Sequence, residues 1–303
     1  MYNAHQLEAN ASRVGDHEVA SLKITEDERR TGRIDPQRLA EAKRLFSSQG
    51  YLRVEDLFTP DQMRAFDRQY RSKNASLLAA TNKADSRPLF TLQIEGAFAD
   101  AQVLDNPLLR PLLSHFLGED FIVAAVSAVA SFPGAPDQFL HRDAEQLFSE
   151  DNEIDKDLPV TTITMLAPLI DFTHETGCTR VWPGSHRIAG TEAGLAVGSL
   201  DPELRVGSVL LTDGRVLHRG AANRSDRVRP LFYLTFHRSW FRDFGGYTER
   251  PPILVSDREL ARLDPGARAR LAWFRDAYAG IRLKYLVKRR LPPWLRLRIS
   301  RDL

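Results

Sequence analysis

Cysteine is scarce in this sequence: Cys178 is the only one among 303 residues. A single thiol cannot close an internal disulfide, and it cannot build a zinc site from several thiolates. The sequence also lacks an apolar run long enough to span a bilayer, and residues 1–30 contain no apolar signal core. These absences predict a cytoplasmic protein without a membrane-spanning segment.

An excess of either charge is also missing. The chain carries 42 Lys and Arg against 40 Asp and Glu, a formal net charge of +2. This balance gives no overall electrostatic drive toward nucleic acid or a membrane surface, so we expect a small-molecule ligand instead. Apolar residues make up 43% of the chain, enough for one substantial core. A homo-oligomer is compatible with the sequence, which does not specify the oligomeric state.

The N-terminal part divides into a leader and a helical layer. Residues 1–33 show no sustained apolar period and end in a charged run, which predicts a flexible leader. Asp35 and Pro36 then begin a helix that Gly50 ends, and Thr59 opens a second helix. A short strand over 51–54 and a further helix over about 107–117 complete this part.

The middle of the chain changes to β-branched and aromatic runs bounded by Gly, Pro and Asp. These runs lie at 89–94, 121–132, 160–169, 178–182, 205–211 and 230–237. Short strands without intervening helices favour an antiparallel sandwich or barrel over a doubly wound sheet. We therefore predict a mainly β, α+β fold: a double-stranded β-helix (jelly roll, cupin-like) over residues 34–250, with an N-terminal helical layer and C-terminal helices.

Helical patterns return at 258–282, and the last residues interleave Lys and Arg with Leu, Ile and Trp294. We expect residues 251–303 to form a basic helical extension that packs on the same domain. An amphipathic tail that binds a membrane surface or a partner protein is the alternative.

His141 and Asp143 are the first candidate metal ligands. In an extended strand, side chains two residues apart share a face, so these two point the same way and Arg142 points opposite. One imidazole and one carboxylate can then occupy adjacent positions around a divalent metal. A His-x-Asp triplet alone is also compatible with a surface ion pair.

His218 and Arg229 complete the pattern. His218 follows another β-rich segment, and two histidines with one carboxylate on a β scaffold form the facial triad of non-haem iron(II) oxygenases. Arg229 lies eleven residues beyond His218 at the start of a predicted strand. Its planar guanidinium suits a carboxylate such as the distal one of 2-oxoglutarate.

Taken together, these elements resemble the phytanoyl-CoA dioxygenase (PhyH) family of Fe(II)/2-oxoglutarate-dependent dioxygenases, over about residues 38–243. The resemblance includes the helix exit at residues 50–58 and residues 177–187, which contain the Pro-Gly-Ser-His turn typical of the family. It is strongest to members that tailor specialised metabolites. The resemblance implies Fe(II) held by His141, Asp143 and His218, with 2-oxoglutarate and O2 as co-substrates.

The same resemblance implies that Gln138 and Thr179 hydrogen-bond 2-oxoglutarate, although each could instead satisfy local backbone groups. His186 could be mistaken for the third ligand, but the resemblance makes it a structural turn residue. His115, His174 and His237 are expected in the core or on the surface rather than at a metal.

The activity implied is oxidation of an unactivated C–H bond, most simply hydroxylation, with release of succinate and CO2. Desaturation, epoxidation and ring formation remain open, as does the substrate. One alternative is a hydroxylase of an acyl-CoA or an amino-acid derivative. Another is a jelly-roll module that binds metal without turnover.

Overall fold

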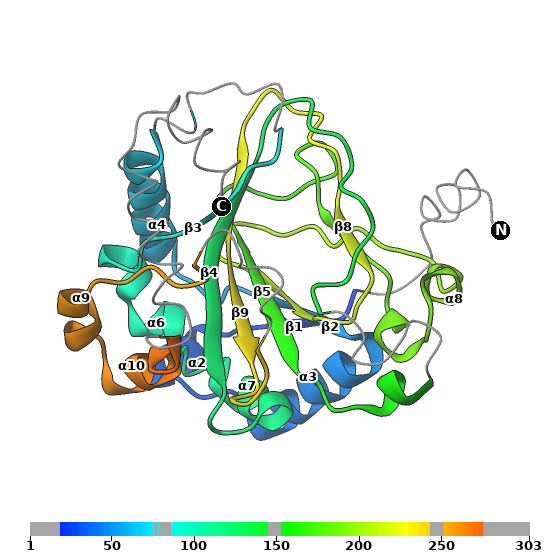
Figure 1. Ribbon diagram of the computed structural model, residues 1–303, viewed down its shortest axis with the longest axis horizontal. Helices are drawn as coiled ribbons and strands as arrows, with labels where there is room; N and C mark the ends of the chain where they lie inside the picture. The colour runs from blue at the N-terminus through cyan, green and yellow to red at the C-terminus, as the bar shows by residue number, and fades with distance from the viewer. Residues whose placement is uncertain (1–18, 76–77, 79–85, 145–152, 243–250, 275–303) are drawn as a thin grey trace, which may run out of the picture.

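The computed structural model describes residues 19–75, 78, 86–144, 153–242 and 251–274. Two sheets of unequal size contain all the strands of the described residues, and helices cover one side of the larger sheet (Figure 1). Among the described residues, no helix is both long and apolar enough to cross a membrane.

The major sheet has seven strands in the order β1-β2-β7-β5-β9-β4-β3. All neighbours are antiparallel except β1 and β2, which run parallel. The bounds are β1 (Ser21–Lys23), β2 (Tyr51–Glu55), β7 (Val209–Asp213), β5 (Thr162–Pro168), β9 (Arg229–His237), β4 (Ile122–Ser131) and β3 (Leu89–Thr91).

The minor sheet pairs β6 (Thr179–Val181) with β8 (His218–Gly220), antiparallel. An isolated antiparallel bridge between His141 and His218 adds the segment that precedes β5 to this sheet. The minor sheet lies on the side of the major sheet opposite the helices α4 (Pro60–Lys73), α9 (Asp257–Arg262) and α10 (Pro265–Leu271) (Figure 1). This two-sheet α+β architecture confirms the predicted jelly roll with its helical layer.

Residues typical of helix ends explain where the helices begin and end. Asp35 caps α3 by accepting from the N–H groups of Gln37 and Arg38, Pro36 occupies its first turn, and Gly50 ends it at a left-handed φ of 74°. The α-helices are α2 (Glu26–Thr31), α3 (Pro36–Gln49), α4 (Pro60–Lys73), α6 (Ala101–Leu104), α7 (Arg110–Leu117), α8 (Thr191–Leu195), α9 (Asp257–Arg262) and α10 (Pro265–Leu271). Three 3-10 turns are η1 (Gly96–Ala99), η2 (Glu153–Asp157) and η3 (Ser185–Arg187).

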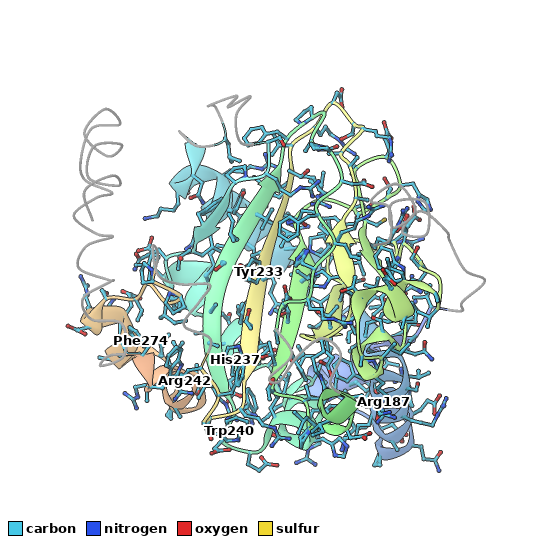
Figure 2. All side chains as sticks on the ribbon, turned by 45° about the vertical axis from the view of Figure 1, so that its right-hand side comes forward. Arg187, Tyr233, His237, Trp240, Arg242 and Phe274 are labelled. Atoms are coloured by element: carbon cyan, nitrogen blue, oxygen red, sulfur yellow. The ribbon has the colours of Figure 1, made fainter. Side chains whose placement is uncertain are left out.

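Strand β9 contributes side chains to the core on one face of the sheet and to a pocket on the other, because its side chains alternate between the two faces. On one face, Phe232 meets Phe66 of α4 and Phe98 of η1 at ring-centroid distances of 5.3 Å each. On the other face lie Tyr233 and His237, which Figure 2 labels along the strand. The buried aromatic cluster therefore holds β9 in place from behind while its opposite face stays available.

The structure corrects the expectation of a flexible leader up to residue 33. Residues 21–31 contain β1 and α2, and the described leader packs on the domain because Leu22 and Ile24 are buried. A capping box between Thr25 and Glu28 starts α2. The short apolar stretch gave no periodic signal because only three residues pair with β2. Residues 1–18 lie outside the described part.

The described portion of the C-terminal extension packs against β4. Trp273 donates from its indole to the carbonyl of Val123 at 3.0 Å, and Val126 donates to the carbonyl of Pro252 at 3.1 Å. The basic tail from residue 275 onward, with its alternative partner-binding or membrane-binding role, lies outside the described residues. The division at residues 33 and 250 stays a prediction.

Candidate active site

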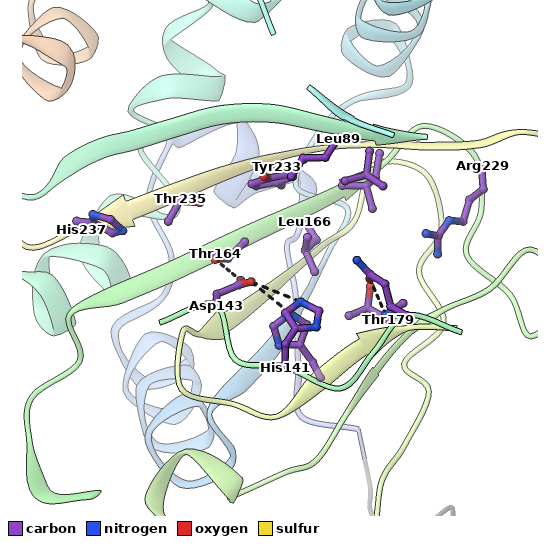
Figure 3. A pocket seen from close by; sticks show the side chains of 15 residues that line it. Leu89, His141, Asp143, Thr164, Leu166, Thr179, Arg229, Tyr233, Thr235 and His237 are labelled. Carbon is purple, nitrogen blue, oxygen red and sulfur yellow. Dashed lines mark hydrogen bonds and ion pairs between the residues drawn. The ribbon is translucent and has the colours of Figure 1, made fainter. Parts of the chain in front are cut away.

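A pocket of about 180 Å³ lies between the two sheets. Figure 3 shows its lining: side chains of β5 and β9 form one wall, and the minor sheet with the segment around His141 forms the other. The pocket contains all six residues predicted from the sequence. They are Gln138, His141, Asp143, Thr179, His218 and Arg229.

His141, Asp143 and His218 converge in this pocket, each offering one ligand atom within 4.8 Å of the others. Nε2 of His218 lies 3.4 Å from Oδ1 of Asp143, and Nε2 of His141 lies 3.9 Å from the same oxygen. The segments that carry the two histidines are joined by a pair of backbone hydrogen bonds of 3.0 and 3.1 Å between these residues. Two imidazole nitrogens and one carboxylate oxygen thus face a common point.

The backbone fixes the tautomer of both imidazoles. Nδ1 of His141 lies 2.9 Å from the carbonyl oxygen of Phe139, and Nδ1 of His218 lies 3.0 Å from that of Val216. Because a carbonyl only accepts, each Nδ1 carries a proton, which leaves the Nε2 that faces Asp143 as the nitrogen that can bind a metal. This is the arrangement that protein backbones commonly impose on metal-binding histidines.

Thr164 of β5 orients the carboxylate by donating to Oδ2 of Asp143 at 2.7 Å. Burial opposes ionisation of Asp143, but the neighbouring His218, His141 and this hydroxyl hold its pKa far below the usual range. Burial likewise opposes protonation of His218, yet Asp143 raises the pKa of that imidazole. Burial and the charge of His218 lower the pKa of His141. The cluster therefore contains a firmly ionised carboxylate, as a cation site requires.

Arg229 lies at the opposite end of the pocket and is 1% exposed. Its guanidinium stacks 4.6 Å over the ring of Phe172 and donates to the carbonyl of Gly177, while its Nε has no hydrogen-bond partner among the described residues. Burial and the charge of Arg87 lower the pKa of Arg229 to about 9. The guanidinium stays cationic at neutral pH at a free-energy cost, which an incoming anion would offset.

Gln138 and Thr179 also line the pocket. The side-chain oxygen of Gln138 accepts from the N–H of Gly220 at 3.0 Å, so the local structural role considered from the sequence is present. Thr179 sits on β6, paired in register with Gly220. Both side chains line the pocket, and Figure 3 shows Thr179 on the same side of the pocket as His141.

The other histidines that the structure describes do not join this cluster. Nε2 of His186 lies 3.1 Å from the carbonyl oxygen of Ser47, a structural contact of the Pro-Gly-Ser-His turn. His115 packs on Phe116, and His174 is exposed beside Asp201. His237 is buried as a core histidine, but it also lines the pocket.

Sequence reasoning missed several pocket residues. Strict alternation from Arg229 along β9 would have found Leu231, Tyr233, Thr235 and His237, which all line the pocket. Thr164 follows the same alternation on β5, but no sequence motif marks it. Arg87 does not line the pocket, but its charge helps to lower the pKa of Arg229. It had no signal in the sequence because it precedes β3 as an isolated arginine; it donates to the carbonyls of Pro136 and Ala221 at 2.7 and 3.1 Å.

Comparison with known proteins agrees with this geometry. Residues 46–231 match the sequence profile of the family "Phytanoyl-CoA dioxygenase (PhyH)". The dioxygenase aneA of Aspergillus aculeatus is 32% identical over 184 residues, which cover 58% of this chain and 59% of that protein. The Fe(II)/2-oxoglutarate-dependent dioxygenase nvfF of Aspergillus novofumigatus is 34% identical over 125 residues, or 40% of this chain and 41% of that protein. The matched part thus spans less than two thirds of either relative.

Among solved structures, the epimerase SnoN in complex with Fe3+, alpha ketoglutarate and nogalamycin RO is similar in fold. The TM-score is 0.55 at 17% identity, and the similarity covers 74% of this chain and 98% of SnoN. At this identity the likeness supports the fold and leaves the reaction to the residues of the site.

Proposed function

The chain belongs to the phytanoyl-CoA dioxygenase (PhyH) family, and we propose that it is an Fe(II)/2-oxoglutarate-dependent dioxygenase that hydroxylates a C–H bond of an uncharged small molecule. His141, Asp143 and His218 hold the iron. Arg229 pairs with the distal carboxylate of 2-oxoglutarate, with Gln138 and Thr179 beside it.

The convergence of two Nε2 atoms on one oxygen of Asp143 is the observation that carries this proposal. The donor set fits iron(II), since two neutral imidazoles and one carboxylate leave further coordination positions for the co-substrates. The buried Arg229, with an unpartnered Nε and no carboxylate among the charges that shift its pKa, fits a carboxylate ligand. A metal-binding module without turnover would have no use for such a costly buried cation.

With iron(II), 2-oxoglutarate and O2 bound, the metal centre supplies the oxidant, and the overall change converts R–H, 2-oxoglutarate and O2 into R–OH, succinate and CO2. The protein contributes orientation. Thr164 holds one oxygen of Asp143 so that the other faces the histidines, and the carbonyls of Phe139 and Val216 keep both Nε2 lone pairs directed at the metal.

The lining of the pocket favours an uncharged substrate. Its apolar members are Leu89, Val129, Leu166, Leu231 and Tyr233. Among the described lining residues, the only cation besides the histidines is Arg229 and the only carboxylate is Asp143, and both have roles in cofactor binding. The charged groups of an amino-acid derivative would therefore lack partners on these walls.

Anaerobic titration of the metal-free protein with iron(II), followed by 2-oxoglutarate, tests the cofactor assignment. We expect a weak visible charge-transfer band in wild type, no band in His218→Ala and a greatly weakened one in Arg229→Ala. His174→Ala is the matched control, because His174 is exposed and remote from the cluster. Absence of the band in folded, iron-loaded wild type would remove the basis of the proposal.

Hydroxylation is tested separately from cofactor binding. Candidate substrates are incubated with iron(II), 2-oxoglutarate and O2, and products are analysed by mass spectrometry. We expect one added oxygen atom per product and one succinate per turnover. Succinate formation with a product that contains no added oxygen would contradict hydroxylation while leaving the dioxygenase assignment in place.

A further inference from the structure

Arg142 lies between two of the proposed iron ligands but points away from the pocket. Its Nη1 donates to the carbonyl of Ser185 at 3.1 Å and to the carbonyl of Arg215, and its Nη2 donates to the carbonyl of Ile188 at 3.4 Å. The alternation of an extended strand requires this direction, because His141 and Asp143 occupy the pocket face. One guanidinium thus connects the ligand segment to two other parts of the chain.

Both of these parts are connected to His218, one along the chain and the other by a hydrogen bond. Arg215 precedes it by three residues in the same loop. Ser185 begins the η3 turn, and its hydroxyl accepts from the N–H of Leu217, the residue before His218, at 2.9 Å. The same hydroxyl donates to the carbonyl of Trp182 at 2.6 Å. Arg142 and Ser185 therefore form a continuous link behind the iron site, from the His141 segment to the His218 segment.

This link adds to a backbone connection on the pocket side. There the His141 segment is joined to the His218 segment by the bridge between the two histidines and by hydrogen bonds from the N–H of Gln138 to the carbonyl of Gly220 at 2.8 Å and from the N–H of Ala144 to the carbonyl of Gly214 at 2.9 Å. The guanidinium of Arg142 adds contacts on the face of the His141 segment that is turned away from the pocket. The separation of the two Nε2 atoms depends on the relative position of the two segments.

We propose that Arg142 is a positioning residue that fixes the spacing of His141 and His218, and that it thereby raises the affinity of the site for a divalent metal. The inference rests on the proposed function, since it assumes that these histidines bind iron(II). Arginine is suited to the task because its planar fork reaches several carbonyls at once, whereas lysine is a single point charge. Outer-shell partners of metal ligands typically change metal affinity by about 10- to 100-fold when removed.

Arg238 provides a matched control. It also donates from a partly buried guanidinium to two carbonyls, those of Val160 at 2.7 Å and Phe116 at 2.6 Å. Its links join β9 to the segment before β5 and to α7, so they do not connect the two ligand segments. Loss of general packing should affect Arg142→Gln and Arg238→Gln alike, whereas loss of ligand spacing should affect only the former.

The test measures the affinity of iron(II) alone for metal-free protein, by anaerobic competition with a chromophoric chelator, and the absorption spectrum of the Co(II)-substituted protein. We expect iron(II) binding to weaken at least about 10-fold in Arg142→Gln, with a changed Co(II) spectrum, and to change less than about threefold in Arg238→Gln. Arg142→Lys should also bind iron(II) more weakly than wild type, and it decides the question if Arg142→Gln does not fold.

The outcomes separate the two hypotheses. Wild-type iron(II) affinity and an unchanged Co(II) spectrum in folded Arg142→Gln or Arg142→Lys would overturn the positioning role, as would an equal loss in Arg238→Gln. Failure of wild type to bind iron(II), or undiminished binding by His218→Ala, would instead overturn the proposed function itself.

Discussion

Thr164 lies on β5 and Asp143 lies on the segment that faces it across the pocket, and a 2.7 Å hydrogen bond joins the hydroxyl of Thr164 to Oδ2 of Asp143. As a result, Oδ1 of Asp143 is the oxygen turned toward Nε2 of both His218 and His141. The carboxylate is therefore directed at the proposed metal position by a residue that does not itself belong to the ligand set.

Thr164→Val should weaken iron(II) binding, because the carboxylate loses the donor that fixes its rotation. We expect a decrease in affinity of about 10-fold, measured by anaerobic competition with a chelator. Thr235→Val is the control: Thr235 lies directly opposite Thr164 in the β5–β9 register and lines the same pocket without a bond to Asp143. Equal affinities for Thr164→Val and Thr235→Val would show that the hydroxyl does not orient the ligand.

Arg229→Ala should separate binding of 2-oxoglutarate from binding of iron. Removing the charge-assisted pair should weaken 2-oxoglutarate by roughly 100-fold or more, while iron(II) affinity stays near wild type. The thermal stability of the protein without 2-oxoglutarate should fall little, because the variant also removes a buried cation whose pKa is lowered. Calorimetric titration of the iron(II) protein measures the first effect. Unaltered 2-oxoglutarate affinity would place the co-substrate elsewhere.

Much of the proposed site could be predicted from the sequence. Strand alternation and the order along the chain restrict where side chains can point, so the sequence could predict four site residues: His141, Asp143, His218 and Arg229. The family resemblance supplied the roles of Gln138 and Thr179. The structure brings all six together in one pocket. Their ligand roles stay predictions until the metal titration is made.

The remaining contacts depend on tertiary packing, which local pattern does not encode. Arg142 was expected to point away from the metal, but its carbonyl partners come from loops more than forty residues away. Arg87, whose charge helps to lower the pKa of Arg229, comes from a segment with no motif. Residues 21–31 were wrongly expected to belong to a flexible leader, because the pairing of three residues with β2 leaves too short a signal in the sequence.

The stability of the protein should depend on His237 at mildly acidic pH. Burial, with a contribution from Arg242, lowers the pKa of His237 from its usual 6.5 to about 4. Between these values the unfolded chain binds the proton and the folded chain does not, so this contribution is present above pH 6.5 and is lost as the pH falls toward 4. Wild type should therefore lose roughly 1–2 kcal/mol more than His237→Gln between pH 7 and pH 5. Urea unfolding at both pH values measures the difference, and parallel losses would contradict it.

Gly177→Ala should damage both the fold and the 2-oxoglutarate end of the pocket. Gly177 has a φ of +90°, and a Cβ there would lie 2.6 Å from the carbonyl oxygen of Ala221 and 2.7 Å from that of Ala222. Both obstacles are backbone atoms, so the turn must move, and with it the Gly177 carbonyl that accepts from Arg229. We expect a destabilisation of about 2–4 kcal/mol together with weaker 2-oxoglutarate binding.

Gly134→Ala separates the two causes of that loss. Gly134 has a similar φ of +79°, but a Cβ added there would meet nothing within 4 Å. The free energy of unfolding of Gly134→Ala should therefore fall by only about 1 kcal/mol, the cost of a left-handed backbone for a residue with a Cβ, and the variant should keep the 2-oxoglutarate affinity of wild type. Denaturant unfolding and calorimetric titration of both variants make the comparison. If Gly177→Ala loses no more stability than Gly134→Ala and binds 2-oxoglutarate normally, the turn does not position Arg229, and stacking on Phe172 is left as the contact that holds its guanidinium.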